Sequence, residues 1–294
     1  MLDRLLALIL GTLLALVKVM PLQWFDPCGA GLAWLIRPFA RRDLAHLRRN
    51  VHAAFGLPPK THFSRMFEQQ VLRHHLVCGL ETLRIIQDPS VMQVVGIEAL
   101  KLAVAEAEVH GKGHEVITAH LGSWELCAYL GQQAASRPFH VLAKPPKHPV
   151  AVTFLNGVRK KMGVQILWTD RKSILKDMLS ALKRGESIGF VMDQKPQGRQ
   201  GPVVPFFGME TEFVSGPAAM AVRTGCAVIG LFCVREGPFR YRAVTKPLLP
   251  ANHGETNEDA LTGKMAATIE GVIRDYPEQW TWNYKRWRTP RLSS

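Results

Sequence analysis

The stretch EVITAHLGSWE, residues 115–125, joins a short apolar run to a turn and the start of a helix. Residues 115–119 are mostly apolar and partly β-branched, which predicts a buried strand. His120 stands at the end of this strand. The chain then turns and enters a helical segment at Trp124, for which Ser123 is the expected N-cap. The pattern predicts a strand, a turn and a helix with a histidine at the corner.

The spacing of His120 and Glu125 is compatible with a catalytic pair. In one continuous helix, residues five apart point about 140° away from each other, whereas a turn lets Glu125 reach back towards His120. A carboxylate that accepts from one ring nitrogen fixes the imidazole tautomer and leaves the other nitrogen free as a base. The spacing fits equally well a structural histidine beside a glutamate that stabilises the helix N-terminus. We expect no metal, because helical zinc pairs use a four-residue spacing and need a third ligand.

Similar apolar runs alternate with helical patterns along the rest of the chain, which predicts an α/β fold with crossover helices. No repeat or interdomain linker interrupts this alternation, so residues 41–294 are expected to form a single domain. The predicted strands are 139–143, 164–168, 187–192, 226–234 and 240–245, and the predicted helices are 43–54, 61–86, 97–108, 149–162, 172–183, 214–224 and 255–276.

The composition indicates an anionic partner. The chain has 294 residues and carries 37 Lys+Arg against 24 Asp+Glu, a net charge of +13. Such an excess suits a phospholipid surface, a phosphorylated substrate or an acidic carrier. It would also suit nucleic acid, but the chain has no nucleic-acid-binding motif, so we expect none. The five cysteines are scattered without a CxxC motif, which favours buried thiols over disulfides.

The N-terminal region, residues 1–40, is predicted to be a membrane anchor. Leu5 to Val17 is a run of 13 uncharged residues, which is shorter than the roughly 20 residues of a full span. A second apolar piece, Gly29–Ile36, follows two interfacial aromatics. A signal peptide is the competing interpretation, but no cleavage site follows the first run. Arginines are concentrated after the segment, which predicts a cytoplasmic catalytic domain.

The motif HLGSWE resembles the His-x4-Asp/Glu motif of membrane glycerolipid and lipid A acyltransferases. It is most similar to the bacterial lipid A biosynthesis acyltransferases of the lauroyl/myristoyl type, in which the usual string is close to HFGNWE. Four further blocks of that family occur here in the same order: NGVR at 156–159, MDQ at 192–194, VVPFFG at 203–208 and PEQW at 277–280. The resemblance covers essentially the whole chain. It implies a central mixed sheet with flanking helices, an uncleaved N-terminal anchor and a place at the bacterial inner membrane.

The resemblance also implies the reaction. An acyl group would pass from an acyl carrier protein or coenzyme A thioester to a hydroxyl of a lipid A precursor or a similar phosphorylated glycolipid, at an anionic membrane and without a cofactor. His120 would be the general base, and Glu125 would orient it and stabilise its charge. Arg159 would bind the oxyanion or the substrate, although a phosphate contact or a surface position is the alternative. Asp193 would orient Arg159, position the acceptor or serve a purely structural role. Lys195 stands where the family often has a second acid.

Three other functions are compatible with the sequence. One is acylation of another lysolipid or glycolipid, and one is a basic peripheral membrane-binding protein without catalysis. The third is a hydrolase that uses Ser123 or Cys127, which the absence of a G-x-S-x-G motif disfavours.

Two further segments have uncertain roles. The residues 203–208 and the face of the helix at 61–86 are candidates for an acyl-chain slot. The tail at 280–288 interleaves aromatics with cations, which suits either a lipid headgroup interface or an aromatic cluster packed on the sheet.

Overall fold

The computed structural model describes residues 2–58, 61–196 and 201–287. Its centre is a seven-stranded sheet in the order β1-β9-β8-β2-β5-β3-β4, in which every neighbouring pair is parallel except β8 and β9. The predicted α/β fold with a central mixed sheet is therefore confirmed. The strands are β1 (Gln93–Val95), β2 (His114–Thr118), β3 (Phe139–Ala143), β4 (Gln165–Trp168), β5 (Ser187–Val191), β8 (Ala227–Gly237) and β9 (Arg240–Leu249).

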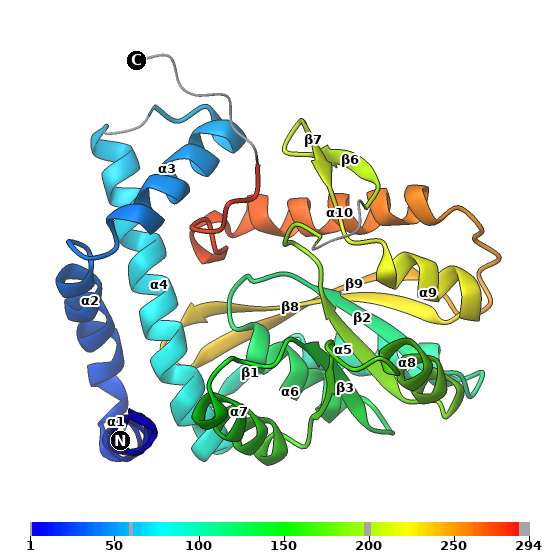
Figure 1. The fold of residues 1–294 in the computed structure, drawn as a ribbon, viewed down its shortest axis with the longest axis horizontal. Helices are drawn as coiled ribbons and strands as arrows, with labels where there is room; N and C mark the ends of the chain where they lie inside the picture. Colours follow the sequence, from blue (N-terminus) through cyan, green and yellow to red (C-terminus); the bar gives the residue numbers. More distant parts are fainter. Residues whose placement is uncertain (1, 59–60, 197–200, 288–294) are drawn as a thin grey trace.

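Helices cover both faces of the sheet, with α10 along one face and α6 along the other (Figure 1). Successive residues of β2 point into separate apolar cores, with Ile117 in one and Val116 in the other, as the period of two in a strand requires. The helices are α3 (Arg41–Phe55), α4 (His62–Gln87), α5 (Ile97–Glu108), α6 (Trp124–Ala134), α7 (Pro149–Lys161), α8 (Ile174–Lys183), α9 (Gly216–Thr224) and α10 (Glu258–Asp275), with short 3-10 turns η2 (Pro89–Val91) and η3 (Pro277–Gln279).

Three strands were not predicted. The strand β1 has only three residues, too few for a periodic pattern. The hairpin of β6 (Val203–Phe206) and β7 (Met209–Glu212) turns at Phe207 and Gly208, both with positive φ. A phenylalanine rarely adopts this conformation, but here the ring of Phe207 is buried and its backbone N–H donates to Glu270 over 2.6 Å. Tertiary contacts thus hold a turn that the local sequence does not announce.

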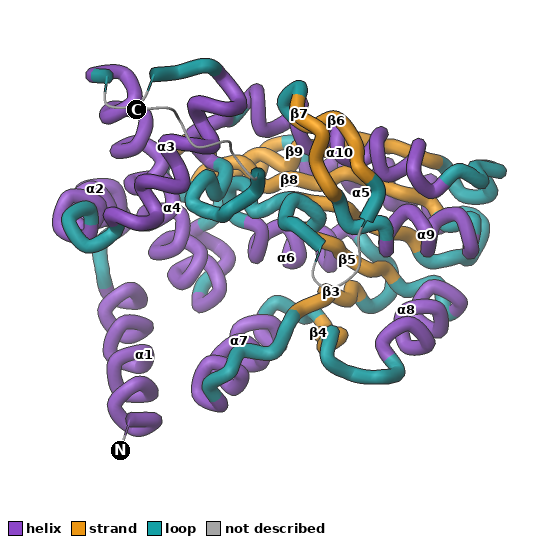
Figure 2. Tube along the Cα trace, turned by 45° about the horizontal axis from the view of Figure 1, so that its top comes forward, coloured by secondary structure: helices purple, strands orange, loops and turns teal. Residues whose placement is uncertain are grey.

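The N-terminal region forms α1 (Leu2–Val19), the turn η1 (Leu22–Trp24) and α2 (Phe25–Ile36). The helix α1 extends from α2 at the edge of the molecule (Figure 2) and contacts α4 and α7, with Val17 buried and the amide of Gln87 donating to the carbonyl of Leu14 over 3.2 Å. Within the described residues, no individual helix has both the length and the apolar character of a membrane span. The segments Asp3–Val19 and Leu22–Ile36 have them only when taken together, and they are bent by 117°. The apolar N-terminal region thus consists of two helices at an angle, and an anchor formed by one helix is not confirmed.

The helix α2 packs closely against α4 and β8. Phe25 and Ala33 are fully buried, and Gly29 lies so near Val77 of α4 that an added Cβ would come within 2.3 Å of its side chain. Asp26 accepts from Arg235 of β8 over 2.9 Å. Residues on either side of position 40 therefore pack against each other.

Candidate active site

His120 and Asp193 lie side by side at the carboxyl edge of the sheet. They follow the parallel neighbours β2 and β5, whose register pairs Thr118 with Val191. His120 and Asp193 each lie two residues beyond this pair, so their side chains meet. His120 Nδ1 lies 2.7 Å from Asp193 Oδ1, and the backbone N–H of His120 donates to Oδ2 over 3.0 Å. An ionised carboxylate only accepts, so Nδ1 carries the proton and Nε2 carries the lone pair.

The geometry leaves Nε2 of His120 free to act as a base, because it has no hydrogen-bond partner within the described part of the chain. Burial alone lowers the pKa of His120. The charge of Asp193, its hydrogen bond and the charge of Glu125 outweigh burial and raise the pKa above its ordinary value. Burial alone would raise the pKa of Asp193. His120 and Trp280 outweigh burial and hold the pKa of that carboxyl below its usual range. The pair is built to keep Asp193 charged and to stabilise an imidazolium.

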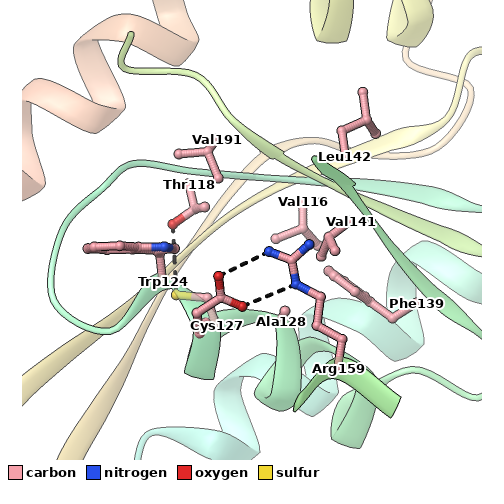
Figure 3. Close-up of a pocket in the computed structure, with 12 residues that line it drawn as sticks. Val116, Thr118, Trp124, Cys127, Ala128, Phe139, Val141, Leu142, Arg159 and Val191 are labelled. Carbon is pink, nitrogen blue, oxygen red and sulfur yellow. Dashed lines mark hydrogen bonds and ion pairs between the residues drawn. The ribbon is translucent and has the colours of Figure 1, made fainter. Parts of the chain in front are cut away.

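Glu125 does not hold the imidazole ring as expected. Its carboxylate accepts from Arg159 of α7, over 3.0 Å from Nη2 and 3.3 Å from Nε (Figure 3). Glu125 acts on His120 through its charge, whereas the carboxylate that orients the ring is Asp193. The expected contact from Asp193 to Arg159 is replaced by the contact from Glu125. The structure thus brings the four predicted residues into one site but exchanges the partners of the two carboxylates.

Arg159 is buried, whereas its neighbours Lys160 and Lys161 are exposed. The three consecutive cations therefore do not share a solvated face. Its Nη1 has no hydrogen-bond partner among the described residues. A buried guanidinium nitrogen without a partner is a donor available to a substrate oxygen.

The turn after β2 uses its own backbone donors internally. The N–H of Gly122 donates to Gln279 O and that of Ser123 to Cys233 O, each over 2.9 Å. A Cβ at Gly122, whose φ is 59°, would meet Cys233 O at 2.1 Å, so this close approach requires glycine. The backbone N–H groups of Gly122 and Ser123 are therefore used within the fold and are not available to an oxyanion.

Ser123 and Cys127 are not placed as nucleophiles. Ser123 occupies the N-cap position of α6, but its side chain makes no capping bond there. Its buried Oγ lies 2.8 Å from Thr82 Oγ1 of α4. Cys127 is also buried, with its thiol directed to the carbonyl of Leu231 at 3.7 Å. Neither side chain is hydrogen-bonded to His120, which disfavours the hydrolase hypothesis.

Two cavities flank Trp124 and Glu125. The first, of about 40 Å³, has an apolar wall from β2, β3 and β5 and a polar side formed by Glu125 and Arg159 (Figure 3). The second, of about 120 Å³, lies between α4 and the start of α6, so the predicted face of the helix at 61–86 does line a cavity. The other predicted slot, residues 203–208, lines neither cavity, because Val204, Phe206 and Phe207 are packed in the core.

The C-terminal segment supplies a site residue that the sequence did not reveal. Trp280 is only 2% exposed and donates its indole N–H to Asp193 Oδ2 over 2.7 Å. Trp282 and Trp287 are buried in the same aromatic cluster, and Arg286 is buried with them. The packed cluster, not a headgroup interface, is therefore the structure of this segment, with Arg288 outside the described residues.

No group of three metal-ligating side chains occurs in residues 2–58, 61–196 or 201–287.

A comparison with known protein families identifies the family of the chain. The model of the family described as bacterial lipid A biosynthesis acyltransferase matches residues 1–289. The chain belongs to this family. The resemblance inferred from the ordered motifs is thereby confirmed, and so is the prediction that the protein is an acyltransferase.

Three relatives of this acyltransferase share about a quarter of the aligned residues with it. The lipid A biosynthesis palmitoleoyltransferase of Escherichia coli (strain K12) is 23% identical over 296 residues, which cover 92% of each chain. The lipid A biosynthesis lauroyltransferase of the same strain is 26% identical over 201 residues, 67% of this chain and 62% of the relative. A phosphatidylinositol mannoside acyltransferase of Mycolicibacterium smegmatis is 25% identical over 179 residues, 60% of this chain and 57% of the relative.

Proposed function

We propose that the protein moves a fatty acyl group from an acyl carrier protein or coenzyme A thioester to a hydroxyl of a lipid A precursor or a similar phosphorylated glycolipid. The observation that carries the proposal is the free Nε2 of His120. The Nδ1 of the same ring lies 2.7 Å from Asp193 Oδ1. The charge of Glu125 acts on the ring, and Glu125 accepts a hydrogen bond from Arg159. The thioester is a substrate, so the proposed reaction needs no resident cofactor.

In the proposed reaction His120 Nε2 takes the proton of the acceptor hydroxyl as its oxygen attacks the thioester carbonyl carbon. Asp193 orients the ring and stabilises the imidazolium that forms. Arg159 donates from Nη1 to the oxyanion or to a substrate phosphate, and Glu125 fixes the guanidinium plane. Collapse of the tetrahedral intermediate breaks the carbon–sulfur bond, and His120 returns the proton to the thiolate. No covalent enzyme intermediate forms.

The surface supports a proposal of membrane attachment on the cytoplasmic side of a bacterial inner membrane. Large apolar side chains are exposed along α1, on the outer face of α2 and at the turn after it, with Trp34 74% and Phe39 85% exposed. Arg41 and Arg42 follow directly and are also exposed. Aromatic and apolar side chains beside arginines suit an anionic phospholipid surface.

Mass spectrometry of total lipid from cells with and without the gene tests this function. Complementation with His120→Ala is the matched control. The proposal predicts a phosphorylated glycolipid that gains one acyl chain only with the wild-type gene, and the mass gained gives the chain length. A gain confined to another lysolipid or glycolipid would favour the second acceptor class, for which the mannoside acyltransferases are the precedent. Unchanged lipids despite normal protein levels would contradict acyl transfer.

A further inference from the structure

The orientation of Asp193 depends on a residue far from it in sequence. Its Oδ1 faces His120 Nδ1, and its Oδ2 receives two donors, the backbone N–H of His120 over 3.0 Å and the indole N–H of Trp280 over 2.7 Å. The carboxylate is 2% exposed, so water does not replace these donors. Without the indole N–H, a buried anionic oxygen loses one of its two donors.

The segment that carries Trp280 also holds the backbone of the histidine turn. The N–H of Thr281 donates to His120 O over 3.0 Å, and Leu121 forms an antiparallel bridge with Trp280. The carbonyl of Gln279 accepts from the turn at Gly122. Residues 279–281 therefore contact both the backbone that carries the imidazole and the carboxylate that orients it.

This segment is itself fixed from behind. Gln279 exchanges side-chain to backbone hydrogen bonds with Arg235 of β8, each over 2.9 Å. The side-chain amide of Asn50, buried in α3, donates to the carbonyls of Trp282 and Tyr284 over 2.7 and 2.6 Å. The position of the indole is thus determined by packing and not by Asp193 alone.

We propose that Trp280 is a positioning residue for acyl transfer, acting through Asp193 on the base His120; the proposal rests on the function proposed above. Its indole N–H holds the carboxylate in the orientation that directs His120 Nε2 to the acceptor hydroxyl. It also withdraws charge from Oδ2, which limits how strongly Asp193 stabilises the imidazolium. The other charged groups that act on this pair are Glu125 of α6 and Arg286 of the C-terminal segment, and neither is changed in the test below.

The variant Trp280→Phe keeps an aromatic ring in the cluster and removes the indole donor. Trp282→Phe is the matched control, because Trp282 is fully buried in the same cluster and donates its indole N–H over 2.6 Å to the carbonyl of Pro277 instead. The assay follows thiol release from lauroyl-coenzyme A in the presence of a tetra-acylated, phosphorylated lipid A precursor.

We expect kcat to fall about tenfold in Trp280→Phe with little change in KM, as for other residues that orient a functional imidazole from behind. The acid limb of the pH profile should move to higher pH, because the less well-bonded carboxylate stabilises the imidazolium more. The loss of one hydrogen bond to a charged group corresponds to a shift of at most about one to two units. Trp282→Phe should show neither change, although both variants lower Tm. Equal effects in the two variants would overturn the proposal.

A measurement on the wild-type protein covers the case in which Trp280→Phe does not fold. With isotope-labelled tryptophan and histidine, the indole N–H signal of Trp280 should titrate with the same midpoint as the His120 ring, and that of Trp282 should not. An indole signal of Trp280 that ignores the His120 titration would exclude the coupling. If His120→Ala is inactive and Trp280→Phe and Trp282→Phe have the same kcat and pH profile, only this inference is contradicted. An active His120→Ala would contradict the proposed function itself.

Discussion

At the scale of single residues, the contact between His120 Nδ1 and Asp193 Oδ1, 2.7 Å apart, governs the proposed chemistry. His120 must be neutral to accept a proton, and its pKa is raised by Asp193 despite burial. The rate should therefore fall as pH falls through this raised pKa. The fraction of His120 that is charged grows in that direction, so the loss occurs on the acid limb.

Asp193→Asn should lower kcat by roughly 10²–10⁴-fold, the usual range for loss of a positioned acid–base partner. It should also move the acid limb to lower pH, because removal of the negative charge leaves burial to depress the pKa of His120. Kinetics over a pH series check both effects. An acid limb that stays in place would show that Asp193 does not face the catalytic imidazole.

Glu115 offers a test of stability at the same scale. It is fully buried on β2, and neither carboxyl oxygen has a hydrogen-bond partner among the described residues. Burial raises its pKa well above the ordinary 4.5. The folded state then binds a proton that the unfolded state has released, so the free energy of unfolding falls as pH rises above 4.5, by up to about 1.4 kcal/mol per pH unit from this group.

Glu115→Gln should remove this slope. We expect the variant to be more stable than the wild type at pH about 8 and to lose that advantage near pH 5. Denaturant unfolding at the two pH values measures the difference. Glu106→Gln, at an exposed position of α5, is the control and should change little. A wild-type protein whose stability relative to Glu115→Gln is the same at both pH values would contradict the assignment.

Contacts between site residues that are far apart in sequence could not be predicted. His120 and Glu125 were found because a motif brackets them within six positions. The partner of His120 lies 73 positions away and becomes visible only when β2 and β5 are known to be neighbours in register. Trp280 is a similar case, since an aromatic between cations gives no sign that its N–H reaches a carboxylate 87 positions earlier.

At the scale of elements, α7 delivers Arg159 to the site while Lys160 and Lys161 remain exposed. Arg159→Ala should lose about 10²–10³-fold in kcat if its free Nη1 contacts the oxyanion. Arg159→Lys should rescue poorly, because an ammonium does not reproduce a planar two-pronged donor. Lys160→Ala and Lys161→Ala should stay close to wild type. Steady-state kinetics and Tm for the four variants test this, and comparable small losses at all three positions would remove Arg159 from the site.

The elements themselves were largely predictable, because apolar runs of five or more residues and helical periodicity are local signals. The helix at 97–108 and the strand at 139–143 have the predicted bounds. The missed elements depend on distant contacts: β1 pairs with β9 through only three residues, and the β6–β7 hairpin packs against the tryptophans of the C-terminal segment. Strand order is likewise absent from a local pattern.

At the scale of the whole molecule, the two N-terminal helices differ in how they attach. The helix α1 buries Val17 but leaves most of its large apolar side chains exposed. The helix α2 contributes Phe25 and Ala33 to the core and Asp26 to the ion pairs of Arg235. Deletion of residues 1–20 should therefore weaken membrane association and leave the fold intact. Deletion of residues 1–40 should cost several kcal/mol, since truncation of one buried phenylalanine alone costs about 3–5.

Flotation with anionic vesicles and thermal unfolding distinguish the two deletions. Residual binding of the shorter deletion should decrease with added salt, because exposed charges are screened over about 10 Å at 0.1 M. A 1–20 deletion that remains bound in high salt would place the principal contact on α2 or elsewhere. Equal Tm values for both deletions would contradict the structural role of α2.

The most direct test of the central claim uses the purified protein with a lauroyl thioester and a tetra-acylated, phosphorylated lipid A precursor, with the product identified by its mass. His120→Ala is expected to abolish the acylated product, or reduce it by about 10²–10⁴-fold, while it remains folded. Ser123→Ala and Cys127→Ala are expected to retain most activity, because neither side chain is hydrogen-bonded to His120. A fully active His120→Ala, or a Ser123→Ala that is inactive while folded, would contradict a mechanism in which His120 is the base.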